Sequence, residues 1–186
     1  WIHENMRCLY DRLTNHADRR LFTEELMMDC LRRLFPGTHT HEEYFERDPL
    51  IWGDFLRFGA VEKVYEEATD FKRVYKLFDE YLDDYNATIS NSKDDVQASS
   101  MNLVFFKDHC EHLARIVRII KQPRGNALLV GVGGSGKRSL TRLAANIAEY
   151  KRFEIAVGKG YGMNEFHESL LELYTFAGVK CMPLVF

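Results

Sequence analysis

The sequence has 186 residues, of which 46% are hydrophobic, so it is long enough and apolar enough to bury a substantial core. Its 25 basic and 28 acidic residues give a net charge of −3. This balance argues against a nucleic-acid groove or a membrane-binding surface, and the apolar runs fall far short of the roughly 20 residues of a membrane span. We therefore expect neither nucleic acid nor membrane as a partner.

The two ends of the sequence indicate a fragment. It begins at Trp1 without a methionine or a signal-peptide pattern, and it stops at Phe186 inside the apolar, strand-like run 182–186. We expect it to be a piece of a larger protein.

The first 58 residues predict two helices followed by a packed loop. Apolar side chains recur at helical spacing over residues 2–14 and again up to Leu34. Thr23 is a typical N-cap for the second helix, and Pro36 ends it. Residues 37–58 keep no sustained period and predict the loop.

A longer helix is predicted next, and then a linker. Apolar residues hold a period near 3.6 over about residues 61–85, which favours one long amphipathic helix. Residues 87–100 are polar and rich in Ser, Asn and Asp, so they predict an exposed linker and a domain boundary.

Strands and helices alternate in the second half. The predicted elements are a short strand or apolar segment at 103–106, a helix over 107–121, a strand at 126–130, a helix over 137–150, a strand at 153–157, a helix over 164–177 and a strand at 181–186. This order predicts a parallel sheet with right-handed crossovers. His109 and His112 on the first of these helices favour one buried and one exposed histidine over a metal site, since no second ligand pair is evident.

The turn between the predicted strand at 126–130 and the next helix has the spacing of a phosphate-binding P-loop. Gly131, four intervening residues, Gly136 and Lys137 match that motif. Its glycines let backbone N–H groups approach phosphate oxygens, the lysine adds a point charge, and the helix N-terminus adds its positive dipole end.

One position departs from the motif. The residue after Lys137 should be Ser or Thr, to hold Mg²⁺, and here it is Arg138, with Ser139 one place later. Ser139 lies about 100° further round the helix, so it would ligate Mg²⁺ only after a local shift. Hydrolysis also needs a metal-holding acid at the end of a neighbouring strand, and the sequence stops at Phe186 before one appears. We expect no useful ATP turnover from this segment alone.

Several longer runs resemble one family. The run GNALLVGVGGSGKRSLTRLA at residues 125–144 resembles the fourth AAA+ module of an axonemal (ciliary) dynein heavy chain. MNLVFF at 101–106 and RIVRI at 115–119 resemble the lead-in to that module, and YGM at 161–163 resembles the segment after its second strand. HENMR at 3–7 and DRL at 11–13 resemble the helical small subdomain that closes the third module.

The resemblance implies an architecture. The fold class is an α/β P-loop NTPase (AAA+) core with a partial parallel sheet, preceded by an α-helical small subdomain. Residues 1–90 correspond to the small (lid) subdomain of the preceding module, residues 91–100 to a linker, and residues 101–186 to the N-terminal part of the next large subdomain.

The resemblance also implies a function and a site. The parent is a minus-end-directed microtubule motor of cilia or flagella, located in the cytoplasm on the axoneme and its cytoskeleton. Its partners are microtubules, dynein light and intermediate chains, and the neighbouring AAA+ modules, and its third and fourth modules are regarded as regulatory ATP/ADP sites. Arg7 occupies a position where small subdomains often carry a phosphate-sensing arginine. The implied nucleotide-binding residues are Gly131, Val132, Gly133, Gly134, Ser135, Gly136, Lys137, Arg138 and Ser139 around the phosphates, and Leu103 and Val104 beside adenine, with Ser139 as the Mg²⁺ ligand.

Two other functions stay open at this point. A structural AAA+ module with a vestigial P-loop predicts a site that binds no nucleotide. Another P-loop enzyme, such as a kinase or signalling ATPase, predicts a metal-binding acid soon after Phe186 and no lid-like helices upstream.

Overall fold

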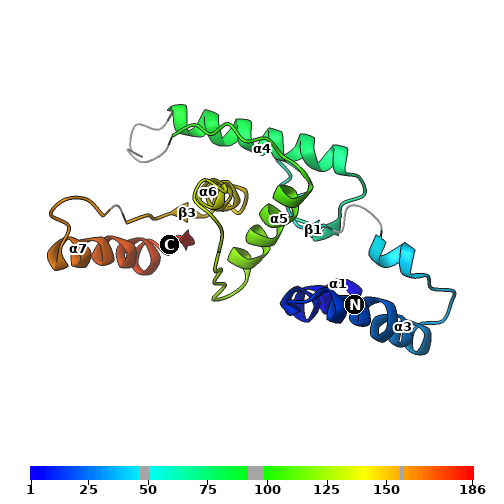
Figure 1. Cartoon of the computed structure of the whole chain (residues 1–186). Helices are drawn as coiled ribbons and strands as arrows, with labels where there is room; N and C mark the ends of the chain where they lie inside the picture. The colour runs from blue at the N-terminus through cyan, green and yellow to red at the C-terminus, as the bar shows by residue number, and fades with distance from the viewer. Residues whose placement is uncertain (47–50, 92–98, 156) are drawn as a thin grey trace.

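The computed structural model describes residues 1–46, 51–91, 99–155 and 157–186 (Figure 1). Its α-helices are α1 (Ile2–Cys8), α2 (His16–Arg20), α3 (Met28–Leu34), α4 (Phe71–Asn91), α5 (Lys107–Lys121), α6 (Lys137–Ile147) and α7 (Met163–Tyr174). A 3₁₀ turn, η1 (Tyr10–Arg12), and three π-helical segments, η2 (Leu21–Met27), η3 (Glu42–Glu46) and η4 (Thr175–Val179), accompany them. The strands are β1 (Trp52–Gly53), β2 (Glu66–Glu67), β3 (Lys151–Arg152) and β4 (Leu184–Val185).

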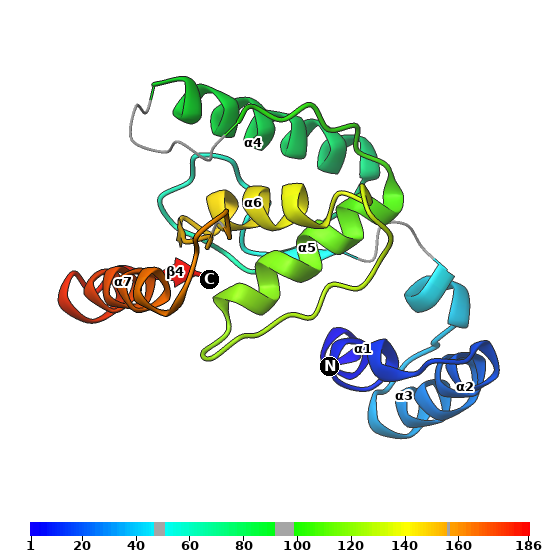
Figure 2. The ribbon, with the colours of Figure 1, turned by 60° about the vertical axis from the view of Figure 1, so that its left-hand side comes forward.

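The helices are arranged in three groups. In both views α1 to α3 lie together at one end, α4 extends over α5 and α6 in the middle, and α7 lies at the other end beside the C-terminus (Figures 1 and 2). Along the described part of the chain, no helix has both the length and the apolarity to cross a membrane.

The core lies where α4, α5 and α6 meet. Its fully buried side chains include Phe55 and Phe78 from the first half and Cys110, Leu113, Val117 and Leu143 from the second. Tyr81 of α4 donates a hydrogen bond of 2.9 Å from its hydroxyl to the carbonyl of Phe55. One core therefore joins residues from either side of 91–100, and the division of the chain into 1–90, 91–100 and 101–186 stays a prediction.

The first two helices differ from the prediction. The helix predicted over 2–14 ends at Cys8 and continues only as η1. The prediction that Thr23 is an N-cap was wrong, because the helix already begins after Asn15, whose side-chain oxygen accepts a hydrogen bond of 2.7 Å from the Asp18 N–H. Thr23 lies inside the continuous helical stretch, and its hydroxyl donates to the Arg19 carbonyl at 3.2 Å.

The helix predicted over 61–85 begins later and ends later. It starts at Phe71 and extends to Asn91, so residues 87–91 of the predicted linker are helical, while residues 92–98 lie outside the described residues. Residues 66–67 pair instead as an antiparallel strand with Trp52–Gly53. Val61, which suggested an apolar stripe, is 101% exposed. The apolar period was accidental at this end, because the segment pairs with an earlier strand in the register Trp52↔Glu67 and Gly53↔Glu66.

The strand predicted at 126–130 was wrong for the described residues. The segment has no strand assignment and no pairing partner, and Leu128 and Val130 are 89% and 86% exposed. A strand needs a neighbour for its backbone N–H and C=O groups, and in the described part of the chain β3 and β4 pair only with each other. Residues 103–106 likewise form no strand; Leu103 and Phe105 pack against the core.

The end of the chain confirms a parallel pairing but not its extent. β3 and β4 are parallel, in the register Lys151↔Leu184 and Arg152↔Val185. The prediction of a strand at 153–157 was wrong for the described residues, because β3 ends at Arg152, before that range begins; residue 156 lies outside the described residues. The second strand is shorter than the predicted 181–186. The helix predicted over 107–121 is confirmed as α5, and those at 137–150 and 164–177 are confirmed as α6 and α7, each with slightly different ends.

The N-terminal helices contact the rest of the molecule through His3 and Asp11. The His3 ring stacks on Trp52 with centroids 4.4 Å apart, and its Nε2 lies 2.6 Å from the Tyr65 hydroxyl. Asp11 accepts a hydrogen bond of 3.2 Å from Arg115 of α5 and lies 3.6 Å from Arg118. Burial, and secondarily the charge of Arg118, lowers the pKa of His3 to about 4.

Replacing Leu143 with Ala tests where the core lies. Leu143 is fully buried at 0% exposure, so the loss of its side chain should lower the free energy of unfolding by about 2–5 kcal/mol. Leu171→Ala on α7 removes a leucine that is 67% exposed and should cost within about 0.5 kcal/mol. Urea unfolding followed by circular dichroism measures both, and equal losses would contradict this core.

His3 should make stability depend on pH. Its folded-state pKa of about 4 lies below the ordinary value of 6.5, so between these pH values the unfolded chain binds a proton that the folded chain does not. Stability from this residue is complete above about pH 6.5 and is lost as the pH falls towards 4. The drop in urea midpoint between pH 7.5 and about pH 4.5 should shrink in His3→Gln and stay unchanged in His167→Gln, an exposed control.

Candidate functional site

Two glycines shape the turn that precedes α6. Gly134 and Gly136 adopt left-handed backbone angles, with φ of +79° and +74°. Glycine takes this conformation without the steric penalty of a side chain. Gly136 is the N-cap of α6, and its carbonyl accepts the first helical hydrogen bond from the Leu140 N–H at 2.8 Å. The turn therefore places Lys137 at the first position of the helix.

The loop closes around the lysine ammonium group. Lys137 Nζ donates to the carbonyls of Gly131 and Val132 at 2.8 and 2.7 Å and to the hydroxyl of Ser135 at 3.0 Å. A methyl group on Gly131 would lie 3.0 Å from that hydroxyl, so the loop is tight at this point.

The charges and donors of the loop fit a phosphate group. The first-turn N–H groups of α6 have no partners within the helix, so the start of the helix attracts an anion, and the ammonium of Lys137 adds positive charge beside it. The sequence-predicted phosphate residues 131–139 are thus brought together in one turn.

Arg138 and Ser139 occupy different environments. Arg138 is exposed, whereas Ser139 is half-buried on α6. Arg138 belongs to a cationic group that also includes Arg142, whose two hydrogen bonds of 2.9 Å hold the pKa of the Glu154 carboxyl below its usual range. Within the described residues, no three His, Cys, Asp or Glu side chains gather into a metal site, so a Mg²⁺ ligand at Ser139 stays a prediction.

The predicted adenine segment lies close to the P-loop. Val104 is 79% exposed, and its carbonyl accepts a hydrogen bond of 3.2 Å from His109 Nδ1 on α5. A methyl group on Gly136 would lie 4.0 Å from Nε2 of the same imidazole. His109 therefore lies between the two parts of the candidate site, a position that helical periodicity alone did not reveal.

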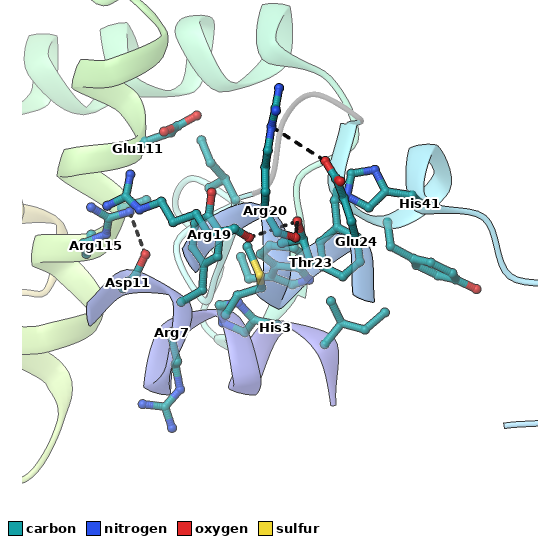
Figure 3. Close-up of a pocket in the computed structure, with 18 of the residues that line it drawn as sticks. His3, Arg7, Asp11, Arg19, Arg20, Thr23, Glu24, His41, Glu111 and Arg115 are labelled. Atoms are coloured by element: carbon teal, nitrogen blue, oxygen red, sulfur yellow. Dashed lines mark hydrogen bonds and ion pairs between the residues drawn. The ribbon is translucent and has the colours of Figure 1, made fainter. Parts of the chain in front are cut away.

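Arg7 lies in the wall of a separate cavity. This cavity of about 770 Å³ lies between the N-terminal helices and α5, and Arg7, Asp11, Arg19 and Arg115 are among its lining residues. In Figure 3 the Arg7 guanidinium points away from Arg19, Arg20 and Arg115. Its Nε donates to Glu4 at 2.8 Å, so the phosphate-sensing role of Arg7 stays a prediction.

Comparison with known proteins identifies the segment. Residues 101–186 match the family model described as the P-loop containing dynein motor region D4. The chain is 44% identical to human dynein axonemal heavy chain 6 and 37% identical to human dynein axonemal heavy chain 1, in each case over 100% of its own length. It is 40% identical over the same extent to the Chlamydomonas reinhardtii dynein-1-beta heavy chain of the flagellar inner arm I1 complex.

The aligned region covers this chain from end to end but only a small part of each relative. The chain spans about 4% of the length of each of these heavy chains. Similarity over the complete segment, together with a mixed helix and strand content, confirms the resemblance and the coarse prediction of a P-loop α/β region. The segment belongs to the axonemal dynein heavy-chain family.

Proposed function

We propose that residues 128–140 form an accessory, regulatory site for ATP or ADP in an ATP-driven, minus-end-directed dynein motor. In this proposal residues 1–90 are the helical lid of the third AAA+ module and residues 101–186 begin the α/β core of the fourth, joined by 91–100. The observation that carries the nucleotide site is the P-loop turn, in which the Lys137 ammonium donates hydrogen bonds of 2.7–3.0 Å to two backbone carbonyls and the Ser135 hydroxyl.

The parent motor would act on microtubules of the axoneme. The relatives are named as axonemal or flagellar heavy chains, which supports a cytoplasmic place in cilia or flagella. Its partners are microtubules, dynein light and intermediate chains, and the neighbouring AAA+ modules. Occupancy of this site biases the geometry of the ring, while the main ATP hydrolysis belongs to another module.

Different residues of the chain bind the phosphates, the adenine and the metal in this proposal. The first-turn N–H groups of α6 and Lys137 hold the β- and γ-phosphates, because both bring positive charge to the start of this helix. The backbone at Leu103 and Val104 lies beside the adenine. Mg²⁺, when bound, neutralises phosphate charge, and the Ser139 hydroxyl is the candidate ligand for it since Arg138 offers no oxygen.

A vestigial, non-binding loop is the second candidate. The observation in its favour is Arg138, which replaces the hydroxyl that usually holds Mg²⁺. Another P-loop ATPase is the third candidate, but 37–44% identity to dynein heavy chains over the complete segment leaves it without support.

Replacing Lys137 with Ala should weaken ATP binding by about 10–100-fold, because one charge-assisted hydrogen bond contributes about 1.5–3 kcal/mol. Photolabelling of the full heavy chain with azido-ATP, followed by mass spectrometry of peptides from residues 101–144, measures this site separately from the others. Lys72→Ala on the exposed side of α4 is the matched control. Absence of saturable labelling in the unmodified chain would favour the vestigial loop.

Replacing Arg138 with Thr should make labelling more dependent on Mg²⁺, since it returns the usual metal-ligating hydroxyl. Removal of Mg²⁺ by EDTA should then reduce labelling more in Arg138→Thr than in the unmodified chain. If Ser139 holds the metal, Ser139→Ala should abolish the Mg²⁺-dependent part of labelling in the unmodified chain and leave it intact in Arg138→Thr. An identical EDTA response in the unmodified chain, the two single variants and the double variant would contradict this assignment.

A further inference from the structure

The hydrogen bonds of Lys137 use every donor of its ammonium group. A lysine ammonium carries three N–H donors and no acceptor. In this loop the donors go to the carbonyls of Gly131 and Val132, at 2.8 and 2.7 Å, and to the Ser135 hydroxyl, at 3.0 Å. A phosphate oxygen can therefore take one of these donors only when one of the three acceptors is displaced.

Two of the three acceptors belong to the backbone. The Val132 carbonyl also accepts a hydrogen bond of 3.4 Å from the Ser135 N–H, so moving it would open the turn. The Ser135 hydroxyl differs, because one rotation about χ1 moves it without any change in the backbone. Its hydrogen bond to the ammonium is also the longest of the three. Ser135 is thus the acceptor that a phosphate oxygen displaces most readily.

The Ser135 side chain is folded back towards the first glycine of the motif. A methyl group on Gly131 would lie 3.0 Å from the Ser135 hydroxyl oxygen and 3.6 Å from Lys137 Nζ. Methyl groups on Gly133 and Gly134, in contrast, would meet nothing within 4 Å. The middle of the loop is therefore open, while the hydroxyl and the ammonium face each other beside Gly131.

We propose that the Ser135 hydroxyl is a self-inhibitory contact, which competes with phosphate for the Lys137 ammonium and lowers the affinity of the site for ATP. The inference rests on the proposed nucleotide site at residues 128–140. A charged phosphate oxygen accepts a stronger hydrogen bond from an ammonium than a neutral hydroxyl does, so the phosphate wins the exchange. Part of the binding free energy is nevertheless spent on breaking the contact.

Substitutions at Ser135 and Lys137 separate this contact from the rest of the loop. Ser135→Ala removes the competing acceptor, whereas Ser135→Thr keeps a hydroxyl on the same carbon. Ser135→Ala combined with Lys137→Ala tests whether the two residues act together. Ser90→Ala is the matched control, since this exposed serine of α4 donates its hydroxyl hydrogen bond to the Asn86 carbonyl of its own helix at 2.9 Å.

The experiment measures the azido-ATP concentration that half-saturates labelling of peptides 101–144 in the full heavy chain. This concentration should fall by about three- to tenfold in Ser135→Ala, because one neutral hydrogen bond no longer competes with the phosphate. Ser135→Thr should restore most of the inhibition, and Ser90→Ala should stay within about twofold of the unmodified chain. In the Lys137→Ala background, Ser135→Ala should give no gain. The inhibition constant of inorganic tripolyphosphate, which has no base, should fall by the same factor as the azido-ATP concentration.

Two kinds of result would overturn the inference. Unchanged or weaker binding in Ser135→Ala would show that the hydroxyl does not compete with phosphate. An equal gain in Ser135→Thr, or a gain that survives in the Lys137→Ala background, would show a general loosening of the loop. Failure of the nucleotide site itself looks different, because neither the unmodified chain nor Ser135→Ala would then show saturable labelling.

Discussion

The packing of α5 against α6 is the constraint on which the candidate site depends. Leu113 and Val117 of α5 and Leu143 of α6 are completely or almost completely buried in one core. The P-loop itself is mostly exposed and has little core of its own. Its place in space therefore comes from the helix that follows it, because burying α6 fixes where its N-terminus and Lys137 lie. Close packing of interiors makes such a position hard to shift.

The same helix, α5, organises the other contacts of the chain. Besides its core face it carries Arg115 and Arg118, which meet Asp11 from the N-terminal helices, and His109, which meets the P-loop side. The ion pairs are partly exposed and each contributes only about 0–1 kcal/mol. The half-buried His3, stacked on Trp52, adds a second connection, and its partial burial disfavours the protonated ring. A displacement of α5 would thus change contacts both at the N-terminal helices and at the candidate nucleotide site.

Sequence patterns predicted the local structure well where one physical cause dominated. The helix at 107–121 was predicted with the correct ends, because its apolar period and the Pro123-Arg124-Gly125 stop agree. The prediction failed where a distant partner decided the outcome. Residues 66–67 were predicted to be helical, but they pair as a strand with Trp52–Gly53. Residues 126–130 form no strand in the described part of the chain, because a strand needs a neighbouring strand for its backbone hydrogen bonds. The prediction that Thr23 is an N-cap was wrong for a local reason, because Asn15 caps the helix eight residues earlier.

The sequence by itself determined the P-loop, the departure at Arg138 and the resemblance to axonemal dynein, because glycine spacing and residue identity are local properties. Only the tertiary structure decided which groups surround that loop. The motif assigned Lys137 to the phosphates, but its hydrogen bonds to the carbonyls of Gly131 and Val132 could not be read from the sequence. Neither could the approach of His109 to Gly136 or of Asp11 to Arg115. Asp11 and Arg115 are 104 residues apart, and no periodicity relates them. Such contacts follow from how helices pack, which depends on the shape of the complete core.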